Sequence, residues 1–142
     1  MSKIVIGREF PDLLIEKVKN AKESIKILSF AWRYYPANIG SKIQQFNLEI
    51  VRACQRGVAV SALVNDDHML SFFRGQDIKI KRVNSSKILH AKIIIIDQKY
   101  LFLGSHNLTQ NAFELSHEIS IGIEDQEAIN RCNNFFDNLC LL

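Results

Sequence analysis

Short apolar runs that are rich in β-branched residues alternate with segments of helical spacing in the first half of the chain. Residues 24–31 and 58–64 have the composition of buried strands, whereas residues 10–21 and 43–56 each place apolar side chains on one helical face. Strands and helices that alternate in this way pack most economically as a sheet covered by helices. The alternation therefore predicts an α/β fold.

The second half of the chain adds further strands and a closing helix. Residues 65–75 are polar and aromatic and are expected to form a connection, and residues 126–142 are expected to form the last helix. Additional strands are expected at residues 78–83, 92–96, 100–103 and 117–123. Because 142 residues of ordinary globular composition suit one hydrophobic core, we expect a single domain over residues 1–142.

Charge and cysteine content restrict the function only weakly. Lys and Arg total 18 against 15 Asp and Glu, which favours an anionic partner without identifying it. Cys54, Cys132 and Cys140 form no metal-binding or disulfide pattern, so we expect reduced, partly buried thiols. The N-terminus lacks the apolar core of a signal peptide, and no apolar run reaches the length of a membrane helix. We therefore expect a cytoplasmic protein without membrane insertion.

The segment from residue 89 to residue 107 carries the clearest chemical signal. Residues two apart in a strand share a face, so His90 and Lys92 are expected to project together. An imidazole can attack phosphorus or move a proton near neutral pH, and an ammonium offsets the charge of phosphate oxygens. Ser105 and Asn107 supply neutral donors at the end of the next strand, where Gly104 permits a tight turn. Both groups are expected to meet at one pocket that suits phosphoryl chemistry.

This segment resembles the signature of the phospholipase D superfamily. The signature reads His-x-Lys, four residues, Asp, six residues and Gly-Ser-x-Asn, and every spacing is kept here. Its members in this chain are His90, Lys92, Asp97, Gly104, Ser105 and Asn107. The resemblance implies a phospholipase D-like fold, with a mixed β-sheet flanked by helices on both faces, and a phosphodiesterase that needs no metal and no other cofactor.

The resemblance also implies roles for the site residues. One histidine forms a phosphohistidine while a second histidine, from another copy of the motif, protonates the leaving oxygen. This chain contains one copy, so a homodimer is expected to supply His90 both as nucleophile and as general acid. Lys92 and Asn107 are expected to bind phosphate, with Ser105 as a supporting donor. Asp97 is expected to hold the turn between the two motif strands.

Glu118 falls where single-motif bacterial nucleases of the superfamily carry a glutamate. It is expected to orient and polarise a His90 ring, as the third member of a triad does. An ordinary exposed strand residue is the alternative for Glu118, and a turn cap is the alternative for Ser105.

Basic residues lead directly into the motif and indicate the substrate. The residues expected to bind it are Lys79, Lys81, Arg82, Lys87 and Arg33. They form either a track for phosphates or merely a solvated strand face. The aromatic neighbours of Arg33, which are Trp32, Tyr34 and Tyr35, either stack on bases or pack a loop. Together these residues favour DNA or RNA as the partner.

Three functions remain open from the sequence. The leading hypothesis is an endonuclease with little sequence preference, and the alternatives are a phospholipid phosphodiesterase and a nucleic-acid-binding module without turnover. His68, His106 and His117 are expected to be surface or turn residues, with His106 at most at the rim of the site. The adjacent Asp66 and Asp67 are expected to mark a turn and not a metal site.

Overall fold

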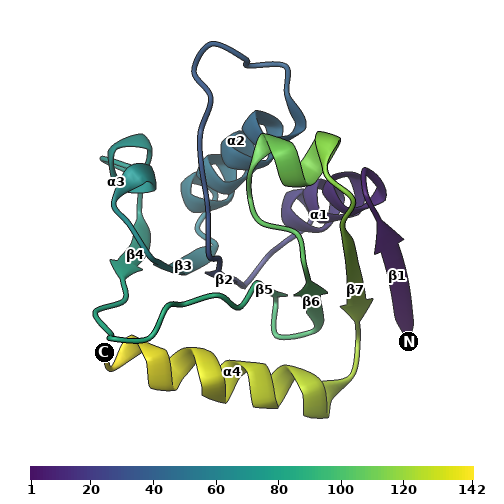
Figure 1. The fold of residues 1–142 in the computed structure, drawn as a ribbon. Coiled ribbons are helices and arrows are strands. Elements are labelled where there is room, and N and C mark those ends of the chain that lie inside the picture. Colours follow the sequence, from purple (N-terminus) through teal and green to yellow (C-terminus); the bar gives the residue numbers. More distant parts are fainter.

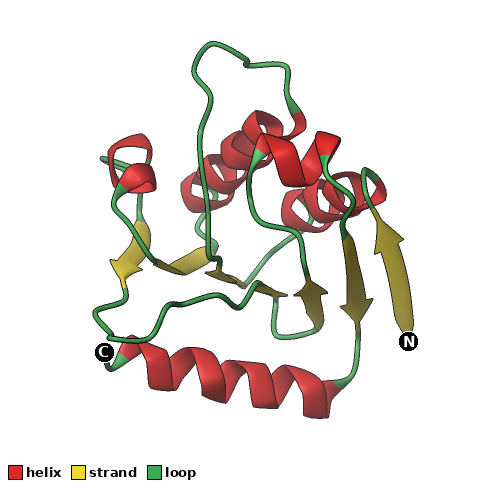
Figure 2. Ribbon diagram, viewed as in Figure 1, coloured by secondary structure: helices red, strands yellow, loops and turns green.

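The computed structural model describes all 142 residues as one seven-stranded sheet with helices on both faces (Figures 1 and 2). The strand order is β1-β7-β6-β5-β2-β3-β4. The strands are β1 (Ser2–Ile6), β2 (Ser24–Leu28), β3 (Ala59–Val64), β4 (Ile78–Arg82), β5 (Ile93–Ile96), β6 (Tyr100–Gly104) and β7 (Ile119–Ile123). Strands β2, β3 and β4 are parallel, and the remaining neighbours pair antiparallel. The predicted α/β class with a mixed sheet is confirmed.

The helices form two layers of unequal size. Helices α1 (Glu9–Lys19) and α2 (Lys42–Gln55) and the π-helical turn η1 (Asn111–Leu115) cover one face, and α4 (Gln126–Cys140) crosses the other (Figure 1). The short helix α3 (His68–Phe72) follows β3. None of these helices has the length and apolar composition that spanning a bilayer requires.

The four consecutive isoleucines of β5 show why both faces are covered. Ile94 and Ile96 pack in the larger core beneath α1 and α2, whereas Ile93 and Ile95 pack in the smaller core against α4. Successive side chains of a strand point to opposite faces, so a run without polar residues requires apolar cover on both sides.

Local capping explains where two helices begin. The side chain of Ser41 accepts a hydrogen bond from the backbone of Gln44 at the start of α2, and Asp125 accepts one from Ala128 at the start of α4. Helix α2 ends just before Gly57, whose φ of +92° lies in the region that favours glycine.

Three elements were not expected from the sequence. Strand β1 buries Val5 alone, so it carries little apolar signal, and α3 and η1 have five residues each. Several predicted strands are also shorter than expected: β2 ends at Leu28, β5 begins at Ile93 and β7 begins at Ile119. Lys92 and Glu118 were expected within strands and instead lie in the segments just before β5 and β7.

Candidate active site

The two motif segments meet at one edge of the sheet. Strand β5 runs antiparallel to β2 and β6, and β6 runs antiparallel to β7. The start of β5, the ends of β2 and β6 and the start of β7 therefore share this edge. The topology thus places His90 and Lys92 on the same edge as Ser105, Asn107 and Glu118.

His90 and Lys92 are in direct contact. Lys92 Nζ lies 3.2 Å from His90 Nδ1 and donates a second hydrogen bond of 2.8 Å to the backbone oxygen of His90. The His90 side chain is exposed, and its ring centroid lies 4.9 Å from that of Phe30. Burial lowers the pKa of Lys92, although the nearby Glu118 carboxylate acts in the opposite direction. The pair thus presents an accessible imidazole beside a partly desolvated cation.

Ser105 joins Glu118 to the start of β7. Its hydroxyl lies 2.5 Å from Glu118 Oε1 and 3.2 Å from the backbone oxygen of Ile119, and it accepts a hydrogen bond from the Ile119 amide. Glu118 makes no hydrogen bond to the His90 ring of the same chain. The carboxylate is consequently held beside the site by Ser105.

Asn107 uses only one end of its side-chain amide within the chain. Its Oδ1 accepts a hydrogen bond of 3.2 Å from the backbone of Ala31, in the segment that follows β2. Its Nδ2 has no protein partner, so two N–H donors remain available for an anion.

Asp97 and Gly104 have structural roles that hold neighbouring segments of the sheet together. The Asp97 carboxylate accepts hydrogen bonds from the backbone amides of Lys22, Glu23 and Ser24 at 2.7–3.1 Å. Burial opposes ionisation of Asp97, but these amides outweigh it and lower the pKa of the carboxyl. This turn lies at the far end of β5 from His90. A side chain at Gly104 would collide with Ser120, so glycine is required by the close approach of β6 to β7.

The basic residues predicted to bind substrate separate into two groups. Arg82 and Lys87 line a groove of about 620 Å³ that also includes Phe30. Lys79 and Lys81 instead line a hollow on the α4 side of the sheet, because side chains alternate along β4, and Lys81 Nζ donates to the backbone oxygen of Cys140. Arg33 is engaged by Asp66 at 2.9 and 3.3 Å. The structure therefore places Arg82 and Lys87 in a groove beside the motif and Lys79 and Lys81 on the α4 side, whereas the Arg33 guanidinium is paired with Asp66.

The aromatic segment after β2 mainly packs. Trp32 is 2% exposed, and its indole donates to Asn47. Tyr35 accepts a hydrogen bond from the Gln110 amide, and Tyr34 packs against His68 with the two rings tilted and their centroids 4.9 Å apart. Of the two interpretations of these aromatics, the structure supports packing.

Asn65 is a site residue that sequence reasoning missed. Its Nδ2 donates to the backbone oxygens of Phe30 and Leu89 at 2.9 and 2.6 Å, and its Oδ1 accepts from the Leu89 amide at 3.1 Å. It thereby fixes the backbone next to His90. An asparagine after a buried strand is the only local signal, and its partners are distant in the chain.

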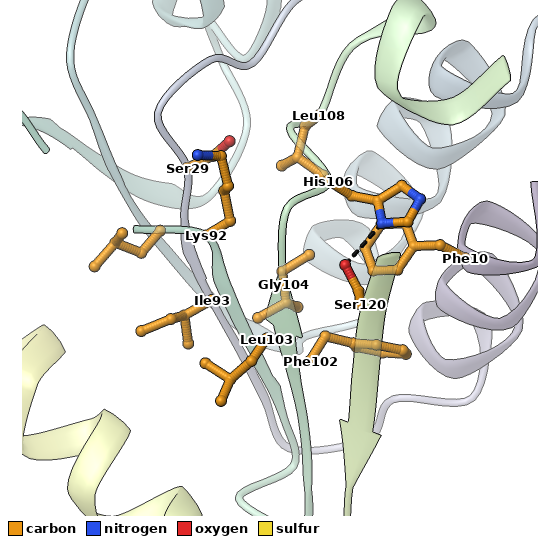
Figure 3. A pocket seen from close by; sticks show the side chains of 12 residues that line it. Phe10, Ser29, Lys92, Ile93, Phe102, Leu103, Gly104, His106, Leu108 and Ser120 are labelled. Atoms are coloured by element: carbon orange, nitrogen blue, oxygen red, sulfur yellow. Dashed lines mark hydrogen bonds between the residues drawn. The ribbon is translucent and has the colours of Figure 1, made fainter. Parts of the chain in front are cut away.

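The prediction for His106 is wrong, because this residue is 3% exposed. Its Nδ1 lies 2.7 Å from Ser120 Oγ, its Nε2 lies 2.9 Å from the backbone oxygen of Gly7, and its ring stacks on Phe10 (Figure 3). Burial lowers the pKa of His106, although the Gly7 carbonyl and Glu118 act in the opposite direction. His68 and His117 are exposed, as expected.

A cavity of about 10 Å³ separates His106 from Lys92 and is lined in part by Ser29 and Ser120 (Figure 3). This volume is close to that of one water molecule. The chain has no group of three His, Cys, Asp or Glu side chains placed to hold a metal, and its three cysteines are free.

Sequence comparisons match the chain to proteins whose names refer to cardiolipin. Residues 14–140 match the family model described as the PLD-like domain of cardiolipin synthase. Mitochondrial cardiolipin hydrolase from Canis lupus familiaris is 25% identical over 122 residues, which cover 82% of this chain and 44% of that protein. Cardiolipin synthase from Oceanobacillus iheyensis is 39% identical over 49 residues, covering 34% of this chain and 10% of that protein. The chain thus spans less than half the length of these curated relatives.

Solved structures match the fold over nearly the whole chain. NucT from Helicobacter pylori superposes with a TM-score of 0.84 at 21% identity, covering 99% of this chain and 95% of that one. The phospholipase D family member Nuc from Salmonella typhimurium gives a TM-score of 0.79 at 18% identity, with 97% and 93% covered. These two likenesses confirm the phospholipase D-like fold.

Proposed function

The chain belongs to the family of the cardiolipin synthase PLD-like domain, and we propose that it cleaves nucleic acid. This family lies within the phosphodiesterases of the phospholipase D superfamily. The observation that carries the proposal is the exposed His90, held by Lys92 at 3.2 Å, beside a groove that contains Arg82 and Lys87. A cationic groove of this kind suits a polyanionic backbone. The activity proposed is that of an endonuclease with little sequence preference.

The reaction proceeds through two displacements at phosphorus. His90 Nε2 attacks the phosphorus, the bond to the leaving oxygen breaks, and His90 of the partner subunit protonates that oxygen. Water then attacks the phosphohistidine, gives a proton to His90 of the partner subunit, and releases the phosphate ester. Lys92 Nζ and Asn107 Nδ2 stabilise the non-bridging oxygens in both steps. No step is assigned to a metal or another cofactor.

The contact between Lys92 and His90 gives a physical reason for a homodimer. An ammonium only donates, so His90 Nδ1 accepts and the proton of the neutral ring sits on Nε2. A nucleophilic Nε2 needs the opposite tautomer, with Nδ1–H donated to an acceptor. We assign that acceptor to Glu118 of the partner subunit, because Glu118 of the same chain makes no hydrogen bond to the His90 ring, and the contact with Ser105 engages only Oε1 and leaves Oε2 free. A second copy would therefore supply both the acid and the group that orients the nucleophile.

Cleavage of a phospholipid is the second candidate. The names of the curated relatives, cardiolipin hydrolase and cardiolipin synthase, favour it. The groove beside His90 opposes it, because Asn84, Ser85 and Ser86 give its lining a polar character that does not suit acyl chains. We therefore rank nucleic acid above phospholipid as the substrate.

The substrate assay compares four polymers with one lipid in parallel reactions with and without EDTA. Labelled single-stranded and double-stranded DNA and RNA are incubated with the wild-type chain, and cardiolipin vesicles are incubated in parallel. Cleavage of a polymer without lipid turnover is expected. Hydrolysis of cardiolipin with every polymer intact would reverse the order of the two candidates, and activity that EDTA abolishes would contradict the phosphohistidine route.

The dimer is tested on the same preparation. Light scattering is expected to give twice the 16.3 kDa mass of the chain, and the activity per chain is expected to fall on dilution through the dissociation range. A monomer with full activity would overturn the shared site.

A further inference from the structure

The groove beside His90 has walls of three kinds. Phe30 and Ile88 supply apolar surface, Arg82 and Lys87 supply positive charge, and residues 84–86 supply an amide and two hydroxyls. Ile88 is 74% exposed, which leaves a large aliphatic side chain uncovered at the rim. Lys87 has no acidic partner, and Arg82 faces Asp67 only at 3.6 Å, where both side chains are about 60% exposed. Both cations are therefore free to meet an anion.

The groove lies directly beside the catalytic histidine. The Phe30 ring lies 4.9 Å from the His90 ring and 5.6 Å from Lys92 Nζ. Asn65 holds both sides of the groove, since it binds the backbone oxygen of Phe30 and both backbone groups of Leu89. A phosphate at His90 and Lys92 would thus have the Phe30 ring as its immediate neighbour.

We propose that this groove binds the unpaired base of the nucleotide that carries the scissile phosphate, with the base stacked on Phe30. The inference rests on the nuclease function proposed above and specifies its substrate. An aromatic ring accepts any base on its face, while the hydroxyls and the amide at residues 84–86 hydrogen-bond to the edge of the base without demanding one sequence. Arg82 and Lys87 hold the next phosphate of the strand.

An unpaired base fits these walls better than a base pair does. The faces of a base within a duplex are covered by its neighbours, so stacking on Phe30 requires the base to leave the helix at a cost of a few kcal/mol. Single strands and frayed ends avoid this cost. The groove therefore makes single-stranded nucleic acid the preferred substrate.

The test measures how much the base itself contributes to cleavage. The wild-type chain is given oligothymidylate and an abasic oligomer of equal length and charge, and kcat/KM is measured for each. We expect oligothymidylate to be cleaved about tenfold faster, which is within the range that stacking on one aromatic ring provides. Phe30→Leu, which keeps apolar bulk without the ring, is expected to slow only oligothymidylate and bring the two rates together. Phe30→Trp is expected to restore the difference.

The matched control is Phe135→Leu, the same substitution at an aromatic residue of α4 that is 46% exposed and lies outside the groove. It should leave both rates unchanged. Equal cleavage of the two oligomers by the wild type would overturn the subsite and leave the nuclease proposal standing. Equal slowing of both oligomers by Phe30→Leu would also overturn it, because Phe30 would then only support His90. Failure to cleave either oligomer or its RNA counterpart would remove the nuclease proposal itself.

Discussion

The two histidines of the motif segment lie at the same edge of the sheet and have opposite environments. His90 is exposed, and Lys92 is the only hydrogen-bond partner of its ring. His106 is buried, both of its ring nitrogens are bonded, and its face is covered by Phe10. A histidine with a free nitrogen can react, whereas one with both nitrogens engaged can only hold the structure together. In the proposed reaction the imidazole of His90 carries the chemistry, and that of His106 supports the structure around it.

The largest expected effect comes from removing the free imidazole. His90→Ala should lower kcat/KM by about a thousandfold or more, because both the nucleophile and the acid disappear from the dimer. The free energy of unfolding should hardly change, since an exposed side chain is lost. Both quantities are measured on one preparation, by cleavage of a labelled oligomer and by urea denaturation.

His117→Ala is the matched control, because His117 is exposed near the same edge and makes no hydrogen bond through its ring. It should retain wild-type activity. If the two alanine variants lost activity equally, the assignment of the nucleophile to His90 would fail.

The opposite pattern is expected at the bound imidazole. His106→Ala removes a buried ring with two hydrogen bonds, leaves the Ser120 hydroxyl without its partner and takes one of two partners from the Gly7 oxygen, which should cost about 2–4 kcal/mol of unfolding free energy. The midpoint of urea denaturation should fall, and the activity of the chains that remain folded should change far less than in His90→Ala. A stable His106→Ala chain without activity would show that His106 takes part in the chemistry.

The sequence distinguishes these histidines only in part. The strands around the motif and the meeting of its two ends follow from spacing and apolar patterning, and the mixed sheet follows from the resemblance to the phospholipase D signature. The burial of His106 follows from neither, because its partners Gly7 and Phe10 come from the turn after β1 and from α1, at the other end of the chain. Contacts between segments that are distant in the chain also determine the role of Asn65, which sequence reasoning does not find. They likewise separate Lys79 and Lys81, on the α4 side, from Arg82, with which the sequence groups them. A pattern read along the chain shows which residues share a face, and not which element covers that face.

A smaller effect is expected at Asp97, which supports the sheet far from both histidines. Asp97→Ala removes the acceptor of three backbone amides and places alanine at a φ of +55°, so it should cost about 1–2 kcal/mol, reduced by the partial exposure of this turn. Asp97→Asn keeps an acceptor and tolerates this backbone conformation, so its loss should be smaller. Urea denaturation measures both, and kcat/KM should stay within a fewfold of the wild type. A large loss of activity at unchanged stability would place Asp97 in the chemistry instead.

The smallest effect is a pH dependence of the unfolding free energy that His106 causes. Burial lowers its pKa in the folded chain below the value of about 6.5 that an unfolded histidine has. The unfolded chain therefore binds the proton first, so stability is complete above about pH 6.5 and falls as the pH drops toward the folded pKa. One such group contributes at most about 1.4 kcal/mol per pH unit. His106→Gln cannot take up this proton, so the wild type should lose more unfolding free energy than the variant between about pH 7.5 and pH 5. If the unfolding free energy of the wild type and of His106→Gln changed in parallel with pH, the buried imidazole would be protonated as readily as one in an unfolded chain. The two histidines would then differ in their hydrogen bonds alone.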